Sequence, residues 1–255
     1  MEVVISLPVV GLLTGVAFAA GFIDSIAGGG GLLMSPAYLL AGIPPTLALA
    51  TNKLVSTMGT SVATANFYRK GKISLKVVAY GALLTWVGAA LGSKCLLLVP
   101  QDMVAKVVMI LLPVAAVAVL YPKKSLKSLD ALRKRDYGII IPLIGLVIGF
   151  YDGFFGPGSG SFLVIAFHVL LGMSLIASSA NAKAFNLVSN VGALIVFMVN
   201  GKILYMLGIP LALGSMAGNF AGSHLAMKKG DGLVRLVLIL ALVGLLASLA
   251  VKTIF

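Results

Sequence analysis

Long apolar runs dominate the chain and alternate with short stretches rich in Gly, Pro, Lys or Arg. A helix that crosses the roughly 30 Å hydrocarbon core of a bilayer needs about 20 apolar residues, and most of the runs approach this length. The pattern therefore predicts an all-α polytopic membrane protein. The apolar runs cover residues 3–26, 32–41, 46–66, 74–94, 104–120, 138–155, 161–171, 175–198, 204–225 and 233–253.

Two of the runs, 32–41 and 161–171, are too short to follow this rule. A helix of about ten residues rises only about 15 Å, which is half of the hydrocarbon core. Each of these runs directly follows a Gly-rich break. We therefore expect each to form a re-entrant or half-length helix after its break.

The chain also contains an internal repeat. The Gly-Phe-Ile-Asp segment at 21–24 returns as Gly-Phe-Tyr-Asp at 149–152, an offset of 149 − 21 = 128. After a two-residue insertion the offset becomes 130 and then holds. One register over so many positions indicates duplication. This register pairs Gly28 with Gly158, Gly42 with Gly172, Lys53 with Lys183, Phe67 with Phe197, Gly88 with Gly218 and Ser93 with Ser223.

The repeat predicts a division of the chain into two transmembrane halves. Residues 1–120 form the first repeat, 121–137 a basic cytoplasmic linker, and 138–255 the second repeat. Each half holds five apolar runs, and an odd number of spans per half places the two copies in inverted topology. Inverted repeats of this kind are a common plan of secondary transporters.

Composition and charge agree with a membrane location. Hydrophobic residues make up 60% of the chain, charged residues 10%, and the mean hydropathy is +1.12, values that a water-exposed surface does not support. The formal charge of +12 does not indicate nucleic-acid binding, because the basic residues lie in short segments between apolar runs. Their distribution predicts a cytoplasmic central loop and outside N- and C-termini in a multi-pass membrane protein.

The Gly-rich breaks are the first candidate binding elements. Non-helical backbone is tolerated inside a membrane where it is buried in protein or lines a cavity, and helix N-termini attract anions. Close helix packing is the alternative interpretation. No Gly-Lys-Ser/Thr step follows either break, so a nucleotide P-loop is not expected. The candidate substrate-binding residues of the breaks are Gly28, Gly29, Gly30, Gly158, Ser159 and Gly160.

Two lysines inside predicted spans complete the candidate anion site. Lys53 and Lys183 lie seven or eight residues from the ends of their runs, and Asn52 and Asn181 flank them. Charged residues inside a span are costly and usually face a cavity or a partner. Inverted copies would bring the two lysines to a similar depth. Ser56, Asn186, Ser189 and Asn190 continue the polar face of these runs.

Two acidic residues near the breaks, Asp24 and Asp152, allow a further set of interpretations. Either carboxylate could accept a proton or couple a cation to transport. A structural salt bridge with Lys53 or Lys183, or a position at an interfacial helix end, is the alternative. No metal site or cofactor is expected, because no His, Cys, Asp and Glu side chains are clustered with ligand spacing. The sequence does not indicate an enzyme either, because no nucleophile and general base stand at useful spacing.

The repeated motifs resemble the TauE/SafE sulfite exporter family over essentially the whole chain. They read G-F-I-D-S-x-x-G-G-G-G at 21–31 and G-F-Y-D-G-F-F-G-P-G-S-G at 149–160, and an Asn-Lys or Asn-Ala-Lys step follows each. The resemblance implies a bacterial or archaeal inner-membrane permease for sulfite, a sulfonate or a related organic anion, usually described as an exporter. The family is commonly drawn with fewer spans than ten, which leaves the two short runs either spanning or re-entrant.

The sequence therefore predicts a secondary transporter that works by alternating access between inverted repeats. A passive anion channel that uses the same polar pathway is the alternative, and saturation and counterflow distinguish the two. The expected partners are a small anion, the lipid bilayer, and protons or a coupling cation.

Overall fold

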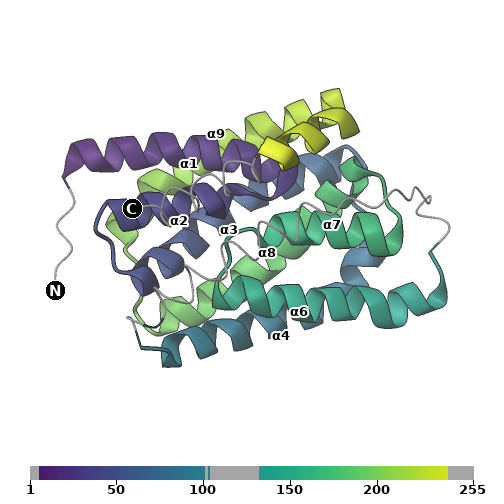
Figure 1. Ribbon diagram of the computed structural model, residues 1–255, viewed down its shortest axis with the longest axis horizontal. Coiled ribbons are helices and arrows are strands. Elements are labelled where there is room, and N and C mark those ends of the chain that lie inside the picture. The colour runs from purple at the N-terminus through teal and green to yellow at the C-terminus, as the bar shows by residue number, and fades with distance from the viewer. Residues whose placement is uncertain (1–5, 101–102, 104–131, 241–255) are drawn as a thin grey trace, which may run out of the picture.

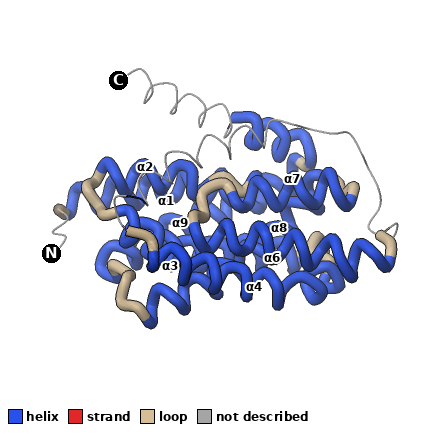
Figure 2. Tube along the Cα trace, turned by 60° about the horizontal axis from the view of Figure 1, so that its bottom comes forward, coloured by secondary structure: helices blue, strands red, loops and turns tan. Residues whose placement is uncertain are grey.

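A computed structural model describes residues 6–100, 103 and 132–240. Within these ranges the chain is helical and contains no β-strand, which confirms the predicted all-α class. Figures 1 and 2 show the helices as one elongated bundle. The runs 104–120 and 233–253 and the linker 121–137 lie wholly or mostly outside the described residues, so they stay predictions.

The described helices follow the predicted apolar runs. The first half contains α1 (Leu7–Ala27), α2 (Gly30–Leu40), α3 (Pro45–Arg69) and α4 (Leu75–Leu98). The second half contains the π-helical turn η2 (Asp136–Ile140), α6 (Ile141–Phe154), α7 (Ser159–Leu171), α8 (Leu175–Val199) and α9 (Tyr205–Lys229).

The two Gly-rich breaks turn the chain back on itself. Gly28 after α1 and Gly158 before α7 have φ of 80° and 83°, a left-handed conformation that favours glycine. From these turns α2 returns along α1, and α7 returns along α6 (Figure 1). The short helices, of 11 and 13 residues, are therefore the second arms of two hairpins whose tips lie inside the bundle.

Each half packs its long helices against helices of the other half. The α1 helix lies along α9 of the other half, and α6 lies along α4. At these contacts glycines allow close backbone approach, because a Cβ at Gly218 would meet Phe18 and one at Gly88 would meet Leu146. The Gly-x-x-x-Gly spacing at 88–92 and 218–222 is typical of such close contacts between membrane helices.

The bundle has two distinct ends (Figure 1). The start of α1, the α2–α3 turn and the α8–α9 turn lie at one end, called here the Lys202 end after a residue of the last turn. The α3–α4 turn, η2, the α7–α8 turn and the end of α9 lie at the other, called the Arg69 end.

The outer surface suits a bilayer. Within the part of the chain that the structure describes, four helical segments are long and apolar enough to cross a membrane: α1, α4, η2 with α6, and α8. The α3 and α9 helices have 25 residues each and sufficient length, but polar residues interrupt their apolar surface. Large apolar side chains point outward, including Leu83 and Met206, which are 70% and 91% exposed.

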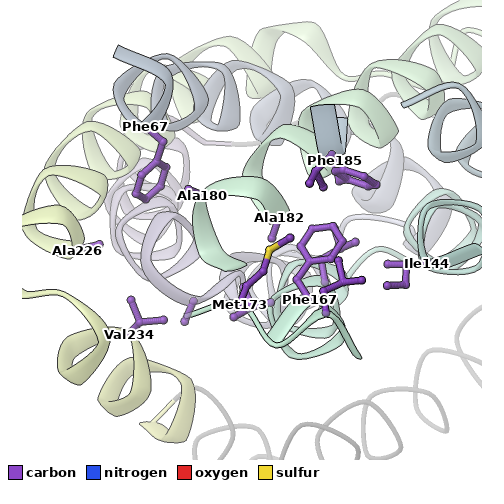
Figure 3. Close-up of a cluster of buried hydrophobic side chains, with 14 of the residues drawn as sticks. Phe67, Ile144, Phe167, Met173, Ala180, Ala182, Phe185, Ala226 and Val234 are labelled. Carbon is purple, nitrogen blue, oxygen red and sulfur yellow. The ribbon is translucent and has the colours of Figure 1, made fainter. Parts of the chain in front are cut away.

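A large apolar core fills the second half. Figure 3 shows part of this cluster, with Phe167 of α7 and Phe185 of α8 close together at its centre. Their rings meet edge to face with centroids 4.9 Å apart, and neither side chain is exposed. A separate core in the first half surrounds Tyr38 and Leu13.

Candidate functional site

Two lysine–aspartate pairs cross between the halves inside the bundle. Lys53 Nζ of α3 lies 2.9 Å from Asp152 Oδ1 of α6. Lys183 Nζ of α8 lies 2.7 Å from Asp24 Oδ2 of α1. Each lysine therefore pairs with the aspartate of the opposite half. The salt bridges that the sequence left open as an alternative are present, and they place all four charges in the interior.

The Asp152 pair belongs to a closed hydrogen-bond network. Ser159 Oγ donates to Asp152 Oδ1, and Ser189 Oγ donates to Oδ2, each at 2.5 Å. Lys53 Nζ also donates to Asn190 Oδ1 at 3.1 Å. The side chains of Lys53 and Asp152 are only 5% and 4% exposed. Both carboxylate oxygens are thus held by the protein, as a buried charge requires.

The Asp24 pair is held less completely. Asp24 Oδ1 accepts the Gly30 N–H at 3.3 Å, and Oδ2 accepts from Lys183. These are its side-chain partners among the described residues. The Asp24 side chain is 16% exposed, whereas that of Lys183 is fully buried. The carboxylate of this pair therefore borders open space, and the ammonium does not.

Both aspartates lie at the N-terminus of the short helix that follows them. Asp24 accepts from Gly30, the first residue of α2, and Asp152 accepts from Ser159, the first residue of α7. Helix N-termini carry unpaired N–H groups and a partial positive charge, and they attract anions. In this conformation the carboxylates of the protein itself occupy the positions that favour an anion.

The two Gly-rich breaks touch each other at the centre of the bundle. The Ser161 N–H donates to Gly28 O at 3.2 Å, and Ser161 Oγ donates to Ala27 O at 2.8 Å. A Cβ on Gly28 would overlap the carbonyl carbon of Gly160. Gly28 and Gly160 are thus glycines because two backbones meet here, so close packing applies to this part of the breaks.

A cavity lies between the two ion pairs and the breaks. Its volume is about 20 Å³, room for about one water molecule in this conformation, and both halves contribute to it. We call it the central cavity. It is lined by Asp24, Gly28, Gly31, Leu49, Asn52, Lys53, Ser56, Asp152, Phe155, Gly156, Gly158, Ser159, Asn186 and Asn190.

A second space, called the side cavity, continues from the first. Its volume is also about 20 Å³, and it extends along α1 from Asp24 past Gly21 to Ala17, toward the Lys202 end. Its lining also includes Asn52 and Ser56, which border the central cavity as well. The open space around Asp24 therefore continues along the first half.

The structure gathers most of the predicted site residues around these cavities. The residues that line one or both are Asp24, Gly28, Gly30, Asn52, Lys53, Asp152, Gly158 and Ser159. The predicted residues outside both linings are Gly29, Gly160, Asn181 and Lys183. Lys183 still belongs to the site through its ion pair with Asp24.

Asn181 has a different set of contacts. Its Oδ1 accepts the Ser74 N–H at the start of α4 at 3.0 Å, and its Nδ2 donates to Ala177 O. In the other half, Thr51 Oγ1 accepts the Leu204 N–H at 3.0 Å. Adding the repeat offset of 130 to positions 74 and 51 gives 204 and 181. Each side chain thus supports the turn that belongs to the opposite half.

Several lining residues were not among the predicted ligands. Ser56, Asn186 and Asn190 lie on the polar helix faces that the sequence shows, and the structure brings them into the central cavity. Leu49 and Phe155 also line it. Apolar residues of this kind carry no sequence signal that distinguishes a cavity wall from a core.

The described residues contain no group of three or more His, Cys, Asp or Glu side chains that could hold a metal ion. His168 Nδ1 lies 2.6 Å from Met173 O, and His224 packs against the ring of Phe220. These contacts give both histidines local structural roles.

The chain matches a known family over nearly its whole length. The family model for Sulfite exporter TauE/SafE matches residues 13–249. A probable membrane transporter protein ORF9 of Sinorhizobium sp. is 40% identical over 230 residues, which are 90% of this chain and 87% of the relative. The probable membrane transporter protein YfcA of Escherichia coli strain K12 is 40% identical over 232 residues, 90% of this chain and 85% of the relative.

More distant relatives carry the same description. The probable membrane transporter protein YjnA of Bacillus subtilis strain 168 is 30% identical over 227 residues, 81% of this chain and 87% of the relative. No solved structure matches the chain. With its apolar helices, its interior ion pairs and this match over nearly its whole length, the chain belongs to the sulfite exporter TauE/SafE family of membrane transporters.

Proposed function

We propose that this protein is a secondary transporter that moves a small anion, such as sulfite, a sulfonate or a related organic anion, by alternating access between its two halves. The observation that carries the proposal is the pair of interior ion pairs, Lys53 with Asp152 and Lys183 with Asp24, each formed across the halves. Both lie beside half-length helices whose N-termini favour anions.

The ion pairs suit a mechanism in which the halves move against each other. Ionisable residues inside a membrane are costly and usually mark a substrate or ion pathway. Because each pair joins one half to the other, a rocking motion changes the distance between its partners. An anion can then replace a carboxylate as the counter-ion of a lysine, which links binding to the movement.

Lys53 is the best placed residue to contact the anion. Its ammonium carries three N–H donors, of which two are used by Asp152 and Asn190. The third is available to a substrate oxygen, since Lys53 lines the central cavity. Asn52 and the first residue of α7, Ser159, line the same space and offer directional hydrogen bonds.

The distribution of charge supports a cytoplasmic Arg69 end. Basic residues near span ends concentrate on the cytoplasmic side of membrane proteins. The Lys202 end holds Lys202 and Lys94. We propose accordingly that the N-terminus lies on the side opposite the cytoplasm. The predicted position of the C-terminus concerns residues that the structure does not describe, so it stays a prediction. The basic residues at the Arg69 end include Arg69, Lys70, Lys72, Arg133, Lys134, Arg135, Lys228 and Lys229.

Uptake into proteoliposomes tests the proposal. The purified full chain should take up labelled sulfite or methanesulfonate with saturation and counterflow, and Lys53→Ala should reduce the initial rate at least tenfold. Lys94→Ala is the matched control, because Lys94 is exposed on the outside of α4. Flux that rises linearly with concentration and shows no counterflow would identify a channel instead. Normal uptake by folded Lys53→Ala and Lys183→Ala would overturn this anion site.

A further inference from the structure

The two interior aspartates occupy corresponding positions of the repeat but have different surroundings in space. Asp152 has both oxygens bonded by serine hydroxyls as well as its lysine, and it is nearly fully buried. Asp24 accepts one long backbone hydrogen bond and one lysine, and its side chain is partly exposed. The central cavity borders both carboxyl groups, and the side cavity borders Asp24.

We infer that Asp24 binds and releases a proton in each transport cycle, so that one proton accompanies each monovalent anion, while Asp152 stays ionised as a structural partner of Lys53. This inference rests on the proposed function and specifies its coupling ion. The geometry that supports it is the incomplete hydrogen bonding of Asp24 and its contact with both cavities.

The charge balance of the site explains the coupling. With both aspartates ionised, the four interior charges cancel, and the site holds no excess positive charge for an anion. A proton that binds the Asp24 carboxylate neutralises it and breaks its ion pair with Lys183. One uncompensated ammonium then remains in a poorly hydrated interior, where an unpaired charge is strongly unfavourable. A monovalent anion restores the balance.

Release reverses these steps. When the site faces the opposite solution, the anion leaves, the proton dissociates from Asp24, and the pair with Lys183 forms again. One proton and one monovalent anion have moved in the same direction, and no net charge has crossed the membrane. The empty site with its ion pair restored is neutral, so it can return without a charge.

Among the residues that the structure describes, few other titratable groups face Asp24. Lys183 of α8 is its direct partner, and Lys53 of α3 and Asp152 of α6 line the central cavity with it. The α2, α7 and α9 helices contribute only uncharged residues to the two linings. The first proton that enters this site therefore has two candidate acceptors, Asp24 and Asp152, and serine hydroxyls already donate to both oxygens of Asp152.

Packing around the two aspartates also differs. Val55 lines the side cavity beside Asp24, and the repeat places Phe185 at the corresponding position of the second half, since 55 + 130 = 185. Phe185 is fully buried, and its ring lies where a Cβ on Gly81 would be and in contact distance of Gly145. The larger ring fills space on the Asp152 side, whereas space stays open on the Asp24 side.

Methanesulfonate is a suitable probe, because it stays ionised over the tested pH range, whereas sulfite titrates near neutrality. Full-length protein in liposomes with a trapped pH dye should acidify the lumen when external methanesulfonate is added. When the outside is one pH unit more acidic than the lumen, methanesulfonate should accumulate in the lumen toward about tenfold, the limit for one proton per anion. Uptake without proton movement in the wild type would overturn the inference and leave the proposed function intact.

Variants then assign the proton to one residue. In Asp24→Asn, the ratio of pH-driven uptake to counterflow should fall to the value without a gradient, and Asp24→Glu should restore part of it. In Asp152→Asn the total rate should fall while this ratio is retained. Asp136→Asn, at the far end of the helical segment that precedes Asp152, is the control. Loss of the ratio in Asp152→Asn but not in Asp24→Asn would refute the assignment to Asp24.

Two further outcomes are informative. If Asp24→Asn does not fold, the proton movement of the wild type and of Asp24→Glu still decides whether a proton accompanies the anion. Dependence of wild-type uptake on a sodium gradient rather than on pH would identify a different coupling ion and reject the proton. If no anion tested is transported by the wild type, the proposed function fails, and the coupling proposal fails with it.

Discussion

The regions around Asp24 and Asp152 are copies in sequence but have become different environments. Around Asp152, serines occupy two positions that are glycines in the first half. Ser159 corresponds to Gly29, and Ser189 corresponds to Gly59. These two hydroxyls supply the hydrogen bonds that Asp24 lacks. Duplication thus provides two similar ion pairs, and a few hydroxyl and apolar substitutions make one of them rigid and leave the other beside open space.

The largest expected effect comes from forcing the two regions apart. Gly28→Ala puts a Cβ into the backbone of Gly160 and also into an unfavourable φ, so the breaks must separate. We expect the unfolding free energy to fall by more than about 4 kcal/mol, with loss of transport, because backbone cannot move aside as a side chain does. Thermal unfolding in detergent measures this.

Gly42→Ala is the matched control for that substitution. Gly42 also has a positive φ of 76°, but a Cβ there meets nothing within 4 Å. It should cost only about 1–2 kcal/mol, the conformational cost alone. Equal losses in the two variants would mean that the contact between the breaks contributes nothing.

Removing each lysine should reveal the difference between the pairs. Lys53→Met leaves the Asp152 carboxylate buried without its cation, and breaking such a pair costs about 3–5 kcal/mol. Lys183→Met should cost less, because Asp24 borders a cavity where water or a proton can compensate it. Thermal unfolding of both variants provides the comparison.

The second substitution in the Asp152 pair provides the control. Lys53→Met combined with Asp152→Asn should recover much of the lost stability, since no buried charge is left alone. A Lys183→Met variant that is less stable than Lys53→Met would contradict the view that the Asp24 region is the more hydrated one.

Exchanging the packing residues tests the difference in open space. Val55→Phe should fill the side cavity and slow methanesulfonate uptake several-fold, and because Val55 is buried in a packed core it should also cost about 1–3 kcal/mol. Phe185→Val removes buried volume beside Gly81 and should cost about 1–3 kcal/mol. Uptake rates and thermal unfolding are measured on the same samples. Unchanged uptake in Val55→Phe would show that the side cavity is not part of the pathway.

The smallest effects are expected where the regions are still alike. Asn181→Ala and Thr51→Ala each remove a side chain that accepts the N–H group of a turn in the other half. Each should cost about 1 kcal/mol, the contribution of one hydrogen bond, and the KM for methanesulfonate should stay within about twofold. A much larger rise in KM for Asn181→Ala alone would place Asn181 in the anion site after all.

Most of the fold was visible in the sequence. The apolar runs predict the described helices to within a few residues, because a bilayer requires long apolar segments whose backbone is hydrogen-bonded internally. The repeat and its glycines predict where the hairpins turn. The candidate site was found only in part. Lys53 and Asp24 stand out because charge is rare in such a chain, whereas Leu49 and Phe155 resemble any core residue.

The sequence by itself determined the membrane class, the repeat, the glycine breaks and the two lysines inside spans, because each of these depends on local composition and spacing. The tertiary structure alone decided how they combine. It pairs each lysine with the aspartate of the other half, turns Asn181 toward a distant turn, and leaves one carboxylate beside a cavity. These outcomes depend on contacts between segments more than one hundred residues apart, and no local pattern specifies them.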